Sequence, residues 1–412
     1  LRLALSLPRW ATRRTENQAH DIMHGHTDNF TFLTQAPIHR VILTMSAPTI
    51  ISMLVTSLYN LADTFFVGQI NTQATAAVGV VFAMMVFVQA VGFFFGHGSG
   101  NFISRELGAR RQETATKMAS TGFFLSFFSG VVILLLGEIF ITPLADLLGS
   151  TPTIMPYTER YMRIVLLGAP FLTASLTLNN QMRLQGNAAY AMYGIVTGAV
   201  LNVLLDPLLI FTMGWGIAGA AWATVIGQVV SFCILFFMAR RGENIAIRFR
   251  NFSPSWAFFK EIFYGGSPSL SRQGLASVAT MMLNVAAGAF GDSAIAAMSI
   301  VSRISMLVLA AVIGLGQGFQ PLCGFCYGAG MYDRLHAAYR YTVKVGTLFL
   351  VVCAIVGWMF SGWLIGVFRN DPQVIAVGVV ALRWQLCTYA FNAFVVASNM
   401  LTQTCRKSWR AT

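Results

Sequence analysis

From about residue 42 onward, the sequence alternates between long apolar runs and short polar breaks. A helix needs roughly 20 apolar residues to cross a bilayer, and each run is longer than that. The runs predict ten transmembrane helices, over 42–68, 73–103, 117–142, 155–183, 189–212, 216–239, 255–288, 292–323, 337–367 and 374–405. Because they are too continuously apolar for barrel strands, the predicted fold class is an all-α membrane protein.

The longest polar break divides these helices into two groups. We expect a cytoplasmic tail over 1–39, a first six-helix bundle over 40–240, a cytoplasmic linker over 241–254 and a second bundle with four helices over 255–412. Within the tail, we interpret residues 1–22 as upstream sequence rather than structure, because Met23 opens a stretch that resembles a natural start.

The two groups are related by an internal repeat at a constant offset of 220 residues. The repeat aligns Pro48 with Pro268, Gly98 with Gly318, Arg163 with Arg383 and Asn179 with Asn399. An even number of helices precedes the restart, so the halves should insert the same way up, as two lobes with a polar-lined cleft between them. Counterparts of the fifth and sixth helices would lie beyond Thr412, which predicts a second bundle without its last two helices.

Charge distinguishes this chain from a soluble protein. Charged residues make up 10% of it, against about 25% in soluble domains. The net charge of +12 comes from residues in loops on one side of the predicted helices, Arg183 among them, rather than from one basic domain. That distribution orients the N-terminus towards the cytoplasm and argues against a nucleic-acid partner.

A carboxylate interrupts the first apolar run. Asp63 lies within it, and no lysine or arginine occurs between Ser46 and Gly68. Placing a charged side chain in the middle of a membrane costs about 2.5–3.5 kcal/mol on insertion scales, so such residues usually face a polar interior. We therefore interpret Asp63 as a functional residue.

A second acid lies in the fifth predicted helix. Asp206 follows Asn202 by four residues, which places both on one helix face. Counting from the helix ends puts Asp206, Asp63 and Thr224 at a similar depth in the outer half of the first bundle. Two carboxylates with amide and hydroxyl oxygens predict a cation or proton site. Asp63 aligns with Leu283, so the second half has no equivalent of this acid.

Burial determines what such a site does. Removal from water favours the uncharged form of a carboxyl group, and a neighbouring carboxyl group reinforces this preference. The pair would therefore hold a proton, or it would bind Na⁺, a hard cation that suits oxygen ligands. No other metal is expected. The alternative is a static carboxyl pair that only joins helices.

Three prolines and three polar residues complete the candidate set. Pro48, Pro207 and Pro268 each remove a backbone donor and so permit helix bending. The candidate residues of a substrate cleft are Arg272, Arg303 and Asn179. The two arginines fit equally well with snorkelling or backbone pairing, and the asparagine with joining helices.

Four stretches of the chain carry a family resemblance: SAPTIISMLVTSLYNLADTFFVG, GHGSGNFISRELGARRQETA, QMRLQGNA and LNVLLDPLLIF. They resemble the multidrug and toxic compound extrusion (MATE) family, and its bacterial DinF-like branch in particular. The resemblance implies a fold of two six-helix bundles around a V-shaped cleft. It also implies an essential first-helix acid at Asp63, cation ligands at Asn202 and Asp206, and partners at Thr224 and Tyr161.

The residues and the resemblance together predict a secondary-active efflux antiporter. It would export amphipathic, cationic drugs or metabolites in exchange for H⁺ or Na⁺, as a monomer in the bacterial inner membrane. The partners are a small-molecule substrate and the bilayer, and neither a cofactor nor an enzymatic activity is expected. Two alternatives stay open: a lipid-linked oligosaccharide flippase of the same superfamily, and an inactive truncated transporter fragment.

Overall fold

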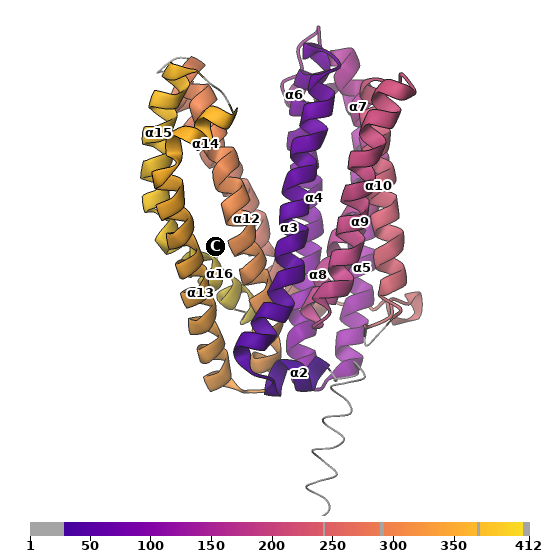
Figure 1. Cartoon of the computed structure of the whole chain (residues 1–412). Coiled ribbons are helices and arrows are strands. Elements are labelled where there is room, and N and C mark those ends of the chain that lie inside the picture. Colours follow the sequence, from indigo (N-terminus) through magenta and orange to yellow (C-terminus); the bar gives the residue numbers. More distant parts are fainter. Residues whose placement is uncertain (1–28, 242–243, 289–291, 369–370, 407–412) are drawn as a thin grey trace, which may run out of the picture.

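The computed structural model describes residues 29–241, 244–288, 292–368 and 371–406. The regular elements of these residues are all helices, and they form two bundles whose helices diverge towards one end of the molecule (Figure 1). The short helix α2 (Asn29–Gln35) lies at the opposite end, which we call the closed end. Residues 1–22, interpreted above as upstream sequence, lie outside the described residues.

Among the described residues, the first bundle contains eight α-helices and a short π-helical turn. They are α3 (Ile38–Gly68), α4 (Thr72–Gly108), α5 (Gln112–Ile139), α6 (Ile141–Leu147), α7 (Met155–Leu167), α8 (Ala169–Leu184), α9 (Ala188–Pro207), the turn η1 (Leu208–Thr212) and α10 (Ile217–Met238). Local sequence fixes some of these boundaries. At the start of α4 the Asn71 side chain accepts a hydrogen bond of 2.7 Å from the Ala74 amide, which satisfies an otherwise unpaired donor.

The second bundle repeats this pattern. After the short 3₁₀ turn η2 (Phe249–Asn251), it comprises α11 (Trp256–Gly288), α12 (Asp292–Gly328), α13 (Tyr332–Met359), α14 (Ser361–Phe368), α15 (Pro372–Cys387) and α16 (Tyr389–Thr404). The bounds of α12, α13 and α16 are those of α4, α5 and α8 shifted by 220 residues. The offset found in the sequence therefore relates whole helices of the two bundles.

Two predicted helices are broken in the structure. The segment predicted over 155–183 is a pair, α7 and α8, bent by 48°, and the segment predicted over 374–405 is a pair, α15 and α16, bent by 50°. At the first break Pro170 has no amide hydrogen to offer the carbonyl four residues earlier, which weakens the helix at this point. Each of these two predicted segments is thus one bent pair of helices.

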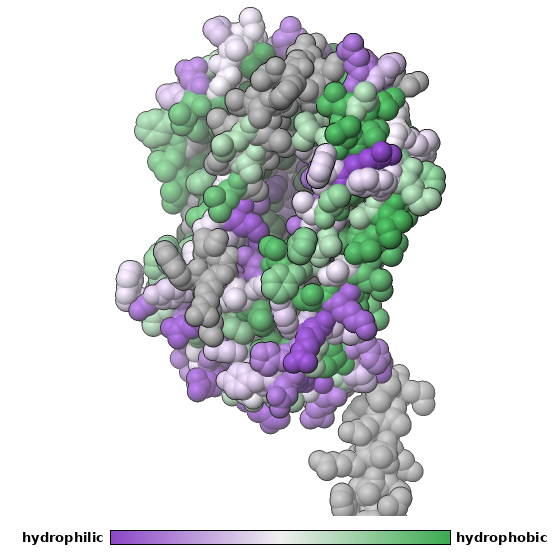
Figure 2. Space-filling view, turned by 90° about the vertical axis from the view of Figure 1, so that its left-hand side faces the viewer, coloured by the Kyte–Doolittle hydropathy of each residue, from purple (hydrophilic) through white to green (hydrophobic). Residues whose placement is uncertain are grey.

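Several helices are suited to a bilayer. Among the described residues, seven are long and apolar enough to cross a membrane, and counting each bent pair as one span gives nine. The total of ten stays a prediction. Figure 2 shows apolar side chains over much of the middle of one face and hydrophilic side chains gathered at the closed end. Such a distribution matches an apolar band between two aqueous surfaces.

Glycines bring the two bundles into close contact. A Cβ atom on Gly98 of α4 would clash with the backbone of Ile262 on α11, and one on Gly318 of α12 would clash with Ser46 on α3. Gly98 and Gly318 are partners in the repeat, so the same small residue forms both halves of a two-fold seam.

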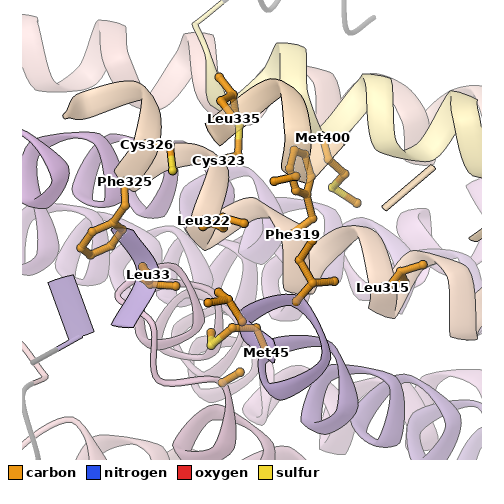
Figure 3. Close-up of a cluster of buried hydrophobic side chains, with 14 of the residues drawn as sticks. Leu33, Met45, Leu315, Phe319, Leu322, Cys323, Phe325, Cys326, Leu335 and Met400 are labelled. Carbon is orange, nitrogen blue, oxygen red and sulfur yellow. The ribbon is translucent and has the colours of Figure 1, made fainter. Parts of the chain in front are cut away.

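A hydrophobic cluster and two arginines reinforce the seam at the closed end. Figure 3 shows Leu33 of α2 and Met45 of α3 beside residues of α12, and the same cluster includes Met400 of α16. Next to it, Arg105 of α4 pairs with Glu261 of α11 at 3.0 Å. Arg334 of α13 donates hydrogen bonds to the carbonyl oxygens of Leu33 and Ala36. The bundles are therefore joined at one end.

Candidate functional site

A cavity lies inside the first bundle. It encloses about 1010 Å³ of empty space, part of it open to solvent, between residues of α3, α4, α8, α9 and α10. From the second bundle it takes only Gln317 of α12. This cavity is distinct from the polar-lined cleft expected between the two lobes, which stays a prediction. Between the bundles, glycine contacts join parts of α3, α4, α11 and α12 on the side of the closed end.

Two acids meet beside this cavity. Asp206 is completely buried in the last turn of α9, and no described group donates a hydrogen bond to either of its carboxyl oxygens. One oxygen of Asp63, on α3, is also buried without a described donor. The two side chains are near enough to interact electrostatically. The structure therefore brings together the two acids that the sequence singled out.

Three polar side chains surround the acid pair. Asn202 donates a hydrogen bond of 3.4 Å to the Thr224 hydroxyl, so α9 is linked to α10. The buried Tyr161 of α7 lies near the same Thr224 and interacts electrostatically with Asp63. The amide oxygen of Asn202 has no described donor. All five predicted residues thus belong to one cluster, and their roles in ion coupling stay predictions.

The sequence analysis missed two members of this region. Tyr59 lines the cavity and interacts electrostatically with both acids. Gln228 also lines the cavity, and its side-chain oxygen is buried without a described partner. Each lies four residues from a predicted site residue, Tyr59 before Asp63 and Gln228 after Thr224, so helical spacing alone was a usable signal.

The backbone near the acids is irregular. Pro207 ends α9 directly after Asp206, and the chain continues as the π-helical turn η1. Because a proline supplies no amide hydrogen, the regular hydrogen-bond ladder is interrupted at this point. Pro48 lies inside α3 and Pro268 inside α11, both within continuous helices. Their effect on helix bending stays a prediction.

Of the three candidate cleft residues, one lines the cavity. Asn179 does so, and it also donates a hydrogen bond of 2.9 Å to the Ala191 carbonyl, which joins α8 to α9. Arg272 instead donates to Asn399 at 3.1 Å and so holds α11 against α16. Arg303 is exposed on α12 and is not among the lining residues. Neither arginine lines this cavity, and their assignment to a substrate cleft stays a prediction.

Arg183 is a further correction. The charge pattern placed it in a loop, yet it lies in the last turn of α8, is 2% exposed and lines the cavity. Its guanidinium group is held by hydrogen bonds to neutral acceptors. A lone arginine at the end of an apolar run is indistinguishable in sequence from a loop residue, so the pattern gave no warning of its burial.

The chemistry of the cluster follows from its burial. Two ionised carboxyl groups without donors would repel each other and would have lost their hydration. The cluster is therefore suited to take up a positive charge from outside, either a proton on one carboxyl group or a small cation among the carboxyl, amide and hydroxyl oxygens.

Comparison with known proteins identifies the family. The family model described as MatE matches residues 48–208 and 268–410, two segments that begin one repeat apart. The chain belongs to the MATE family. Members of this family are multidrug efflux transporters, and the chain is accordingly a multi-pass membrane transporter.

Individual MATE relatives support the same assignment. The multidrug export protein MepA of Staphylococcus haemolyticus is 25% identical over 364 residues, which are 88% of this chain and 80% of MepA. A multidrug resistance MATE family transporter of the MOP superfamily, solved in an outward-facing conformation, is 28% identical with a TM-score of 0.86 over 93% of this chain and 86% of that one. A MATE structure in the straight conformation has the same identity and coverage and a TM-score of 0.87.

Proposed function

We propose that this MATE transporter exports amphipathic, cationic small molecules and takes up H⁺ or Na⁺ in exchange. The observation that carries the proposal is the pair of Asp63 and Asp206 beside a cavity of the first bundle, in which both oxygens of the buried Asp206 and one oxygen of Asp63 lack described donors. Binding of a proton or a cation would neutralise the pair, and a cationic substrate would compete for the same negative charge.

The lining of the cavity supports an amphipathic substrate. Met53, Phe93 and Met192 provide apolar and adaptable surface, while Tyr59 and Asn202 provide hydrogen-bonding groups. Methionine and aromatic side chains repack around ligands of varied shape, which suits a transporter of many compounds. The substrate would lie among them with its positive group towards the acids.

The proposed orientation puts the closed end on the cytoplasmic side of a bacterial inner membrane. In that orientation the bundles diverge towards the outside, and release of substrate would follow neutralisation of the acid pair. The opposite state requires the bundles to part at the closed end. The DinF-like branch and the monomeric state belong to this proposal as well.

The test is transport by vesicles that contain the purified chain. An imposed pH gradient and an imposed Na⁺ gradient are applied separately, and uptake of a fluorescent cationic dye is followed. We expect one gradient to drive uptake, and Asp63→Asn and Asp206→Asn to lower the initial rate by roughly tenfold or more, since each removes a buried charge partner.

The matched control is Asp146→Asn. Asp146 is an exposed acid of α6 in the same bundle, so the substitution changes net charge equally without touching the pair. Its rate should equal that of the unmodified chain. Gradient-driven uptake that survives in both Asp63→Asn and Asp206→Asn would refute the proposed coupling.

A further inference from the structure

Arg183 is the largest of the fully buried side chains among the described residues. It stands at the foot of the cavity, and none of the ion pairs found in the described part of the chain includes it. A buried guanidinium group without a counter-charge is costly unless its donors are satisfied by hydrogen bonds. Its partners therefore determine why it is retained there.

Those partners come from both bundles. Within the first bundle, Arg183 donates to the Asn180 side chain at 2.6 Å and lies 3.3 Å from Nε2 of His97. Across the seam it donates to the Gln317 carbonyl at 2.6 Å and to Oε1 of Gln320 at 2.9 Å, both on α12. One guanidinium group thus joins α8 to the second bundle at the point where the cavity ends.

The Gln317 carbonyl, the main acceptor across the seam, lacks its usual helical donor because of a proline. In a regular helix the Gln317 carbonyl would accept from the amide of residue 321, but that residue is Pro321, inside α12, and it has no amide hydrogen. The carbonyl is consequently available to an outside donor. Arg183 donates to this carbonyl, so a side chain of the first bundle replaces the missing backbone donor of the second.

A second connection lies beside the first. Nδ1 of His97, on α4, is 2.9 Å from the hydroxyl of Ser269 on α11, and Gln403 of α16 donates to the same hydroxyl at 2.8 Å. Gln403 is the residue that aligns with Arg183 in the repeat. The network therefore sits on the axis that relates the bundles, with a charged donor on one side and a neutral amide on the other.

We propose that the hydrogen bonds from Arg183 to the Gln317 carbonyl and to Gln320 hold the two bundles together at the closed end during transport. If the bundles separate there, Arg183 loses two of its acceptors and must be hydrated instead. A partly separated state would leave the guanidinium group neither hydrogen-bonded nor hydrated. These hydrogen bonds therefore favour the closed and the fully separated arrangements of the bundles over intermediate ones. This proposal rests on the proposed function only in requiring that the bundles move relative to each other.

The test measures the distance between the bundles at the closed end. Spin labels are attached to cysteines at positions 112 and 332, which are Gln112 and Tyr332, exposed residues at equivalent positions on α5 and α13. The exposed native cysteines, Cys233 and Cys387, are replaced by serine. Pulsed electron paramagnetic resonance then gives the distance distribution of the full chain in lipid nanodiscs, without substrate or ion gradient.

Two substitutions should shift this distribution. Arg183→Gln removes the charged donor, and Pro321→Ala supplies an amide hydrogen that competes for the Gln317 carbonyl without changing any charge. In each we expect the ratio of separated to closed molecules to rise by roughly tenfold, as for loss of a hydrogen bond to a charged group. Pro321→Ala keeps the proposal testable if Arg183→Gln fails to fold.

Arg163→Gln is the control, because Arg163 is a half-exposed arginine of the first bundle whose ion partner, Glu138, belongs to the same bundle. It should leave the distribution unchanged. A monodisperse Pro321→Ala chain with the unmodified distribution, whatever Arg183→Gln does, would overturn the proposal. Since the measurement uses no gradient, failure of ion coupling at Asp63 would not alter its outcome.

Discussion

The two bundles share their helix boundaries but differ in their chemistry. Where the first bundle has Asp63, Tyr161 and Arg183, the aligned positions of the second hold leucine, alanine and glutamine. The glycines of the seam and the asparagines that join neighbouring helices occur in both. The glycines and asparagines present in both halves therefore build the scaffold, whereas Asp63, Tyr161 and Arg183 occur in the first half only.

This difference assigns separate tasks to the halves. The first bundle holds the two acids and most of the cavity lining. The second supplies the Gln317 carbonyl, which accepts a hydrogen bond from Arg183 of the first. Substitutions at positions aligned by the repeat can separate a structural role common to both bundles from a role found in one bundle only.

The largest effect is expected at an unshared position. Asp206→Asn should reduce dye transport by roughly tenfold or more, because it removes one of two buried carboxyl groups. Asp371→Asn, in the second bundle, removes only a carboxyl group that caps α15 from outside the cavity, and it should leave the initial rate within about twofold of the unmodified chain. Equal losses in the two variants would contradict the division of tasks.

The next effect should be equal in the two halves. Gly98→Ala and Gly318→Ala each place a methyl group against a facing helix, and each should lower the free energy of unfolding by about 1–3 kcal/mol. The measurement is denaturant unfolding in detergent. Gly79→Ala is the control, since a Cβ there meets no atom within 4 Å. A loss in one seam variant only would show that the seam is not two-fold.

A smaller effect should also be shared. Asn179 donates to the Ala191 carbonyl, and Asn399 accepts from Arg272. Removing either bond with alanine should lower the free energy of unfolding by about 0.5–1.5 kcal/mol. Transport provides the contrast, because only Asn179 lines the cavity. Asn179→Ala should raise the KM for dye, and Asn399→Ala should leave it unchanged; the reverse result would move the substrate to the second bundle.

The smallest effect is expected at aligned arginines near the surface. Arg163 faces Glu138 at 3.7 Å and is half exposed, so Arg163→Gln should change the free energy of unfolding by less than about 0.5 kcal/mol. Arg383 donates to Ser361 and lies over the Trp358 ring, and Arg383→Gln should cost about 1 kcal/mol. Thermal unfolding of the two variants in parallel would reveal the order, and the opposite order would be inconsistent with these contacts.

Much of the fold could be predicted because its causes are local. Helix length, apolar content and the 220-residue offset are properties of the chain itself, and the described helices follow them. The acids Asp63 and Asp206 could be found for the same reason, since a carboxyl group in an apolar run is exceptional wherever the run is placed. Tyr59 and Gln228 lie four residues from predicted site residues, but they are uncharged and therefore not exceptional in an apolar run.

Tertiary structure decided what depends on a partner. The position of the cavity follows from which helices touch. The burial of Arg183 depends on the Gln317 carbonyl, 134 residues further along the chain, which has no helical donor because residue 321 is a proline. An arginine at a helix end is hydrated unless another segment offers acceptors, and sequence patterns of one helix contain no information about that segment. The sequence by itself thus determined the helices, their repeat and the two acids, whereas only packing of the bundles decided which charges are enclosed and what holds them.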